Sequence, residues 1–388
     1  MAQQYTMTDG LKRACDFIAE NSGYVNQAIA LHSAVWRGER VDAPPLMLSC
    51  WLTDEQRTWL VQSNYKAIHF DSEKMLANEL QSVLTAINGN SGAVPSMRAN
   101  MGCGIVSTLV GLEQSLFEDK MPWMLRHLKK EEIKPRYDFS VDSSSEFAAA
   151  MRHMEYMQTF LREQRLDNVF IFPLDLQGAV DTAHLIYGDA IFYDFYDDPD
   201  LIHHLLRVSC DAVEFAIREC FARIRRSEEF VTHYNSIVIP RALGGLKVSE
   251  DTTTLLSPDL IDTFALPYLR DILTRFNGGY VHYCGKNDHL LDILLNEPLV
   301  RGINFGNPNK HDMTAVLNRF RDKGKIYVGA ANRLQDESQF DYFKRILGAS
   351  YNPETGCFAV MLHYWCSLQE RDGVLDDYAR AAACVRCQ

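Results

Sequence analysis

The strongest constraint on the fold is an alternation of short apolar runs with segments of helical period through the C-terminal half of the chain. Runs rich in β-branched and aromatic residues lie near residues 280, 302, 326 and 358, and a segment of helical period follows each one. Parallel strands require such crossovers, because the chain must return to the start of the next strand. The pattern predicts the second half of a (β/α)8 barrel. No GxGxxG loop indicates a dinucleotide-binding fold instead.

Capping residues and periodicity predict the remaining elements. Asp198-Pro199 and Ser257-Pro258 are typical helix starts, because the first side chain caps an N–H group and proline fits the first turn. Two helices are expected within 8–40, and others over 71–88 and 145–166; strands are expected over 46–50, 168–174 and 235–240. The stretch VPSMRANMGCGIVSTLVGLEQ predicts a loop over the barrel mouth. With no linker, one domain is expected over 1–388, in which 1–45 form N-terminal helices packed on the barrel.

Composition restricts the classes of partner. The formal charge is −12 and no run of Lys or Arg compensates locally, which argues against nucleic acid as a partner. The N-terminal segment lacks the apolar core of a signal peptide, and no stretch approaches the length of a membrane span. We therefore expect a cytoplasmic protein without a membrane partner, whose ten scattered cysteines are thiols.

The segment GGYVHYCGKNDHLLDILL contains two metal-binding residue types at the end of an apolar run. His282 and Cys284 are two positions apart, so in a strand both side chains project from the same face. They form either half of a metal site or a packed histidine beside a buried thiol. For an isolated pair the second interpretation is the more common.

Four segments, taken in order, resemble the uroporphyrinogen decarboxylase-like superfamily: DLQGAVDTAHLIYG, DFYDDPDLIHHLL, SEDTTTLLSPDLIDTFALPYLRDI and VHYCGKNDHLLDIL. The resemblance is best from about 170 to 347, and ALHSAVWRGERVDAPPLML is similar to the opening helix and first strand of that family. It implies a distorted (β/α)8 TIM-type barrel with extra N-terminal helices. It also implies one of two activities, decarboxylation in the haem pathway or methyl transfer between corrinoid proteins and thiols.

The decarboxylase branch carries an Arg-Gln-Ala-Gly-Arg segment that holds the carboxylates of a tetrapyrrole without a metal. The matching place here reads LMLSCWLTDEQR, with Arg57 alone nearby. Asp71 lies roughly where that branch has a pyrrole-binding aspartate, but it also fits as a helix N-cap. Missing guanidinium pairs disfavour this branch, because other residues do not mimic them. A metal-independent decarboxylase of a porphyrinogen or a smaller carboxylic acid stays the alternative, beside a non-catalytic barrel.

The methyltransferase branch binds zinc through His-x-Cys at one strand end and a further Cys at the end of the last strand. His282 and Cys284 match the first part. Cys357 opens the strand CFAVML and is expected at the bottom of the barrel, whereas Cys366 follows it and is expected at the mouth. We therefore expect Cys366 as third ligand, although it lacks the family's Pro-Gly-Cys-Gly turn. Cys357 and His363 stay open as alternatives.

The resemblance to this branch implies one zinc per chain with an open coordination position, a corrinoid carried by a partner protein, and a small-molecule thiol or acid substrate. Seven polar residues at strand ends or in the glycine-rich loop are candidates for substrate binding, although each could equally satisfy buried backbone groups. They are Arg98, Asn100, Asp175, Gln177, Glu250, Asp251 and Asn304.

Overall fold

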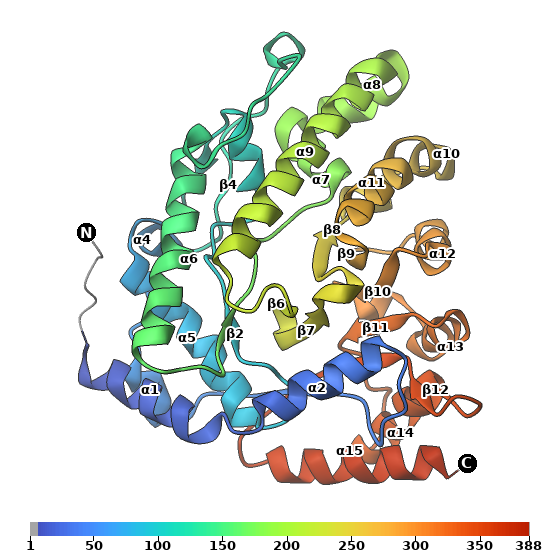
Figure 1. Ribbon diagram of the computed structural model, residues 1–388. Coiled ribbons are helices and arrows are strands. Elements are labelled where there is room, and N and C mark those ends of the chain that lie inside the picture. The colour runs from blue at the N-terminus through green and yellow to red at the C-terminus, as the bar shows by residue number, and fades with distance from the viewer. Residues whose placement is uncertain (1–6, 388) are drawn as a thin grey trace.

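The computed structural model describes residues 7–387 and has the α/β architecture of a TIM-type barrel (Figure 1). Its central sheet has six parallel strands. In spatial order they are β1 (Leu46–Cys50), β14 (Val360–Cys366), β11 (Ile326–Gly329), β10 (Val300–Phe305), β9 (Gly279–Tyr283) and β8 (Leu246–Ser249). The helices that follow β9, β10, β11 and β14 are α12 (Asp288–Asn296), α13 (Met313–Lys323), α14 (Gln339–Ser350) and α15 (Arg371–Arg386). The predicted fold class is confirmed.

The N-terminal half of the barrel is less regular. β2 (Ser96–Met97) pairs in parallel with β5 (Phe170–Ile171), and a bridge between Gln177 and Ser249 leads from this side to β8. The expected strand over 168–174 is thus only two residues long, because Pro173 has no N–H to extend the ladder. Part of the expected mouth loop forms β2, and the rest contains the 3-10 helix Val106–Val110.

The strand expected over 235–240 lies outside the central sheet. β7 (Ile237–Pro240) pairs antiparallel with β6 (Phe230–His233) in a hairpin. Ser236, at the turn of the hairpin, has a φ of 58°, a left-handed conformation that reverses the chain. The barrel strand is therefore the next segment, β8.

The two faces of the sheet are distinguished by what they pack against. Met47, Tyr280, Val328 and Met361 belong to one interior cluster, which α2 (Val25–Trp36) and β7 complete. Trp36 lies in this cluster and donates from Nε1 to the carbonyl of Val238 at 2.7 Å. Side chains at the alternate positions pack in the main cluster with the surrounding helices. The inner face therefore carries His282 on β9 and His363 on β14, whereas Trp365, near the end of β14, is exposed and stacks on Trp51.

The remaining helices form the outer layer and the N-terminal region (Figure 1). α1 (Asp9–Asn21) packs against α3 (Asp54–Trp59) and α5 (Ser72–Gly89). The others are α4 (Tyr65–Phe70), α6 (Ser145–Glu163), α7 (Ala179–Tyr187), α8 (Ile191–Asp197), α9 (Pro199–Arg223), α10 (Pro258–Leu260) and α11 (Leu266–Phe276). Two short antiparallel pairs, β3 (Gln114–Ser115) with β4 (Trp123–Met124) and β12 (Tyr351–Asn352) with β13 (Cys357–Phe358), lie outside the barrel sheet.

The expected caps are present at both proline-containing helix starts. The Asp198 side chain accepts the N–H of Leu201, and Ser257 accepts that of Leu260. The helix that starts at Pro258 contains a π-helical turn at Ile261–Ala265, directly before Pro267, which has no N–H to donate. Within residues 7–387, no helix combines the length and apolar character needed to cross a membrane.

Candidate metal centre

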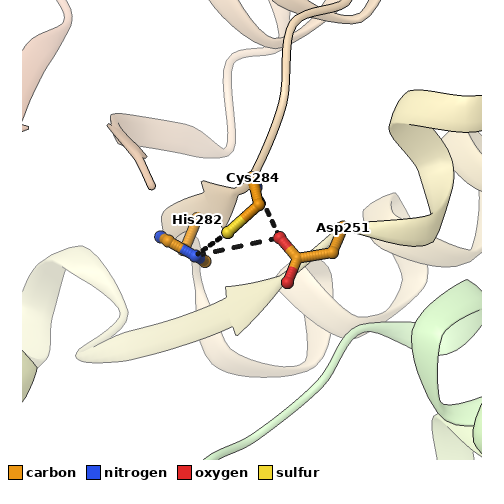
Figure 2. Close-up of side chains that lie close together, drawn as sticks. All are labelled: Asp251, His282 and Cys284. Atoms are coloured by element: carbon orange, nitrogen blue, oxygen red, sulfur yellow. Dashed lines mark hydrogen bonds and ion pairs between the residues drawn. The ribbon is translucent and has the colours of Figure 1, made fainter. Parts of the chain in front are cut away.

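The ends of two neighbouring strands bring His282, Cys284 and Asp251 together (Figure 2). β8 and β9 run in parallel with Ser249 opposite His282, and the N–H of Glu250 donates to the His282 carbonyl at 2.8 Å. Asp251 and Cys284 follow these strand ends, where the Cys284 N–H donates to Asp251 Oδ1 at 2.5 Å. The C-terminal ends of parallel barrel strands thus position all three side chains, as they do in TIM-barrel enzymes generally.

The three donor atoms lie within 4.8 Å of one another. His282 Nε2 is 3.6 Å from Cys284 Sγ and 3.8 Å from Asp251 Oδ1. Imidazole nitrogen, thiolate sulfur and carboxylate oxygen are all established zinc ligands. Within residues 7–387, no other set of three His, Cys, Asp or Glu side chains lies close enough together to hold one ion.

Asn304 fixes the orientation of the His282 ring. Asn304 Oδ1 is 2.5 Å from His282 Nδ1, while the Asn304 amide donates to the carbonyl of Val328 at 2.5 Å. Since the amide nitrogen is used, the oxygen accepts the Nδ1–H, and the Nε2 lone pair faces Cys284 and Asp251. Burial and the positive charge of Lys247 lower the pKa of His282, which favours this neutral tautomer.

Gly306 provides the space for the Cys284 sulfur. A Cβ atom at position 306 would lie 2.4 Å from Cys284 Sγ and 3.3 Å from the His282 ring. Contacts this short do not occur between packed atoms, so any larger residue would displace the thiol. The close approach of β10 therefore requires glycine at this position.

Negative charge is concentrated beside the three donors. The carboxylate of Asp181 accepts the N–H groups of Asp251 at 2.8 Å and Thr252 at 2.6 Å, yet burial and the Asp251 charge raise its pKa to about 7. Burial and then Asp181 also raise the pKa of Glu250, which accepts the Thr253 hydroxyl at 2.6 Å. Partial burial and Asp251 raise the pKa of the Cys284 thiol to about 11. A bound cation would offset the repulsion between these buried acidic groups, so the residues present fit a metal ion.

The structure places Cys366 away from this group. Cys366 belongs to the outer face of β14, and its Sγ lies 3.5 Å from Sγ of Cys50, its register partner on β1. The sequence predicted a strand that ended before Cys366, but β14 continues through it, and the alternation of side chains turns its thiol toward the helices. The side chain that lies with His282 and Cys284 in the group of three potential donors is Asp251.

The two alternatives to Cys366 lie at different places. Cys357 is near the N-terminal end of the barrel, as expected, and its Sγ donates to the Gly38 carbonyl at 3.0 Å. His363 lies on the inner face of β14, opposite Met47 in the register with β1. His363 is therefore the alternative that shares a face with His282.

Four of the predicted substrate-binding residues form one polar network. Asp175 pairs with Arg98 at 3.2 Å and with Lys247 at 3.2 Å, and the Gln177 amide nitrogen lies 3.4 Å from Asp175 Oδ1. Arg98 also donates to Asn100 Oδ1 at 3.4 Å. The Arg98 side chain is only 11% exposed, so it is a buried ion-pair partner and not a solvated loop residue. Lys247 and Arg98 together hold the pKa of Asp175 well below its usual range despite its burial.

The other predicted candidates lie around His282. Glu250 is buried behind the strand end, Asp251 belongs to the donor group, and Asn304 holds the imidazole. Sequence reasoning missed two residues, Lys247 and Asp181. Lys247 had a usable signal, since it is a cation at an inner-face position between apolar Leu246 and Val248. Asp181 lies within α7, and no spacing in its segment distinguishes it.

Comparisons with known proteins identify a shared fold. No family model matches the sequence, and no match was found among curated proteins. Among solved structures, the chain is similar to a methyltransferase from Methanosarcina mazei, with a TM-score of 0.60 and 13% sequence identity. The likeness covers 91% of this chain and 98% of that one. The comparison therefore establishes that the two chains share their fold over nearly their whole lengths.

Proposed function

We propose that this protein is a zinc-dependent methyltransferase that moves a methyl group between a corrinoid on a partner protein and a small-molecule thiol. The convergence of His282 Nε2, Cys284 Sγ and Asp251 Oδ1 at the C-terminal strand ends carries this proposal. The methyltransferase from Methanosarcina mazei, which shares the fold, supports it further. The corrinoid donor and the thiol acceptor in this proposal come from the resemblance of the sequence to the uroporphyrinogen decarboxylase-like superfamily.

The donor set suits a catalytic zinc better than a structural one. Three protein ligands leave a coordination position open, whereas structural zinc sites use four. Cys284 is exposed, so a small substrate can reach the same edge of the group. A bound zinc ion would lower the pKa of a substrate thiol and keep its sulfur nucleophilic near neutral pH.

Residues around the donors have distinct roles in this proposal. Asn304 keeps the Nε2 lone pair of His282 directed at the donor group. Lys247 and Arg98, both paired with Asp175, form a rigid polar group on the inner face near His282. Because these groups are held by their own hydrogen bonds, they do not reorganise during the reaction.

Two cationic side chains near His282 are not free to bind a substrate with many carboxylates. A substrate with many carboxylates requires several guanidinium groups that are free to bind it. In the part of the chain that the structure describes, Arg98 and Lys247 at the mouth are already paired with Asp175. The geometry therefore favours the metal-dependent reaction.

Zinc content and methyl transfer together test the proposal. Protein purified without chelators should contain about one zinc per chain by elemental analysis, and Cys284→Ala should lose it. With methylcobalamin as methyl donor and small thiols such as 2-mercaptoethanol, cysteine and glutathione as acceptors, the zinc-loaded protein should methylate a thiol and the variant should not. Cys387→Ala is the matched control, since Cys387 is also an exposed thiol.

Two results would contradict this function. A metal-free wild type that binds no added zinc would remove the metal-dependent mechanism and leave the decarboxylase as the leading candidate. Stoichiometric zinc without methyl transfer to any thiol, also when partner corrinoid proteins are supplied, would support a non-catalytic barrel.

A further inference from the structure

A cavity lies at the opposite end of the barrel from His282. It has a volume of about 530 Å³, and its lining includes Val300 and Ile326 at the starts of β10 and β11. β10 begins at this cavity and ends near Asn304, the hydrogen-bond partner of His282. The cavity is therefore separated from the candidate metal centre by the length of the strands. Its volume is typical of sites for small molecules.

The charged side chains that line this cavity are all positive. They are Arg37, Arg301, Arg321 and Lys325, and no Asp or Glu is among the lining residues. This is unusual for a protein with a net charge of −12, in which acidic residues outnumber basic ones. A cavity with low-dielectric walls and charges of one sign attracts ions of the opposite sign.

Two of these cations form no ion pair within the residues that the structure describes. Arg37 pairs with Glu39 and Arg321 with Asp322. Arg301 and Lys325 have no carboxylate within 4.0 Å among the described residues; they donate instead to backbone carbonyls, Arg301 Nη1 to Pro298 and Lys325 Nζ to Glu297 and Val300. Carbonyl groups satisfy hydrogen bonds but do not neutralise charge.

The surroundings of Arg301 and Lys325 are unfavourable for two positively charged side chains. Arg301 Nε is buried and has no hydrogen-bond partner, which is costly for a charged group. Burial lowers the pKa of Lys325, and the nearby positive charge of Arg301 lowers it further, although the charge of Glu297 opposes this. An anion between these two side chains would supply negative charge to both.

We propose that this cavity binds a small molecule through a phosphate group held by Arg301, Lys325 and Arg321. A phosphate carries about two negative charges and several acceptor oxygens, so it can satisfy three cationic side chains at once. The apolar lining at Trp36, Leu243 and Phe358 accommodates an organic portion of the same ligand. This site is independent of the methyltransferase proposal, because it shares no residue with the candidate metal centre.

Calorimetric titration of the whole protein with inorganic phosphate and pyrophosphate tests the site. Pyrophosphate should bind at one site per chain, and Arg301→Gln and Lys325→Gln should each weaken it by at least about tenfold. Arg136→Gln is the matched control: it removes the same charge from a side chain that is 84% exposed, and it should bind as the wild type does. Cys284→Ala should also bind normally, which separates this cavity from the metal centre.

Two outcomes would overturn the proposal: no binding of either phosphate probe to the wild type, whether or not citrate binds, or equal losses in Arg301→Gln and Arg136→Gln. Circular dichroism and thermal unfolding verify the fold of each variant. If one substitution at the cavity prevents folding, the other still decides the question, because Arg301 and Lys325 act on the same anion.

Discussion

Cys50 and Cys366 place their sulfur atoms 3.5 Å apart on the outer face of two neighbouring parallel strands, β1 and β14. Burial raises the pKa of Cys50 to about 12 and also raises that of Cys366. Both thiols are therefore protonated at neutral pH and pack among the helices, away from the inner face that carries His282.

The first prediction distinguishes Asp251 from Cys366 as the third zinc ligand. Asp251→Ala should weaken zinc binding by at least about tenfold, because it removes a donor atom. Cys366→Ala should bind zinc as the wild type does, since its thiol faces the helices. Competition with a chromogenic zinc chelator measures both affinities. If Cys366→Ala weakened zinc binding and Asp251→Ala did not, β14 would have to rearrange when the metal binds.

The second prediction concerns the hydrogen bond between Asn304 and His282. Asn304→Ala should weaken zinc binding by about 10- to 100-fold, because the imidazole loses the group that fixes its tautomer. Asn304→Asp should restore much of this affinity, since a carboxylate also accepts the Nδ1–H. Equal affinities in the wild type and Asn304→Ala would show that the ring is held by packing alone.

The third prediction separates a structural from a substrate-binding role of Arg98. Arg98→Ala leaves Asp175 with a single cationic partner, and it removes the positive charge that partly opposes the burial by which the pKa of Glu79 is raised. The free energy of unfolding in urea should fall by about 3 kcal/mol, because a partner of a buried ion pair is removed. Unchanged stability together with a raised KM for the substrate would assign Arg98 to binding instead.

The fourth prediction is a loss of stability at acidic pH through His32. His32 is fully buried between the Gly92 carbonyl at 2.7 Å and the Val238 N–H at 3.1 Å, and burial lowers its pKa from 6.5 to about 4. The unfolded chain thus binds a proton that the folded chain excludes. Stability is therefore complete above pH 6.5 and falls as the pH drops toward 4, by about 3 kcal/mol for this group.

Urea unfolding of wild type and His32→Gln between pH 7.5 and 5 measures this effect. The variant should be less stable at pH 7.5, and the difference should shrink as the pH falls, because glutamine does not titrate. His233, whose pKa burial also lowers, to about 3, keeps part of the slope in the variant. A constant difference across this range would show that His32 does not contribute to the acid sensitivity.

The periodicity of apolar residues predicted the barrel because each of its C-terminal strands is followed by a long amphipathic segment. The same pattern gave the wrong length for β5, which ends before Pro173, and the wrong partner for β7, which a left-handed turn at Ser236 pairs with β6. Those features depend on single backbone positions, which a periodic pattern does not reveal. The strands of the C-terminal half, from β9 onward, were thus readable from the sequence, whereas the strands and pairings of the N-terminal half were only partly so.

The candidate site was predictable to the same degree. The spacing of His282 and Cys284 along one strand fixed their common face, and the structure brings them within 3.6 Å. Asp251 lies beside His282 and Cys284 because β8 pairs with β9, and the spacing of residues within one segment does not predict this pairing. The placement of Cys366 depended on where β14 ends, and the aromatic run before it obscured that end.

The two faces of β14 also limit how this site can change in evolution. Trp365 and Cys366 are adjacent, yet Trp365 is 44% exposed and stacks on Trp51, whereas Cys366 is buried against the helices. A single nucleotide change converts a tryptophan codon into a cysteine codon, so replacement of Trp365 would place a thiol on the exposed side of this strand end. A chain with this fold can therefore gain or lose an accessible thiol on β14 by point mutation, without an insertion and without any shift in the pairing of its sheet.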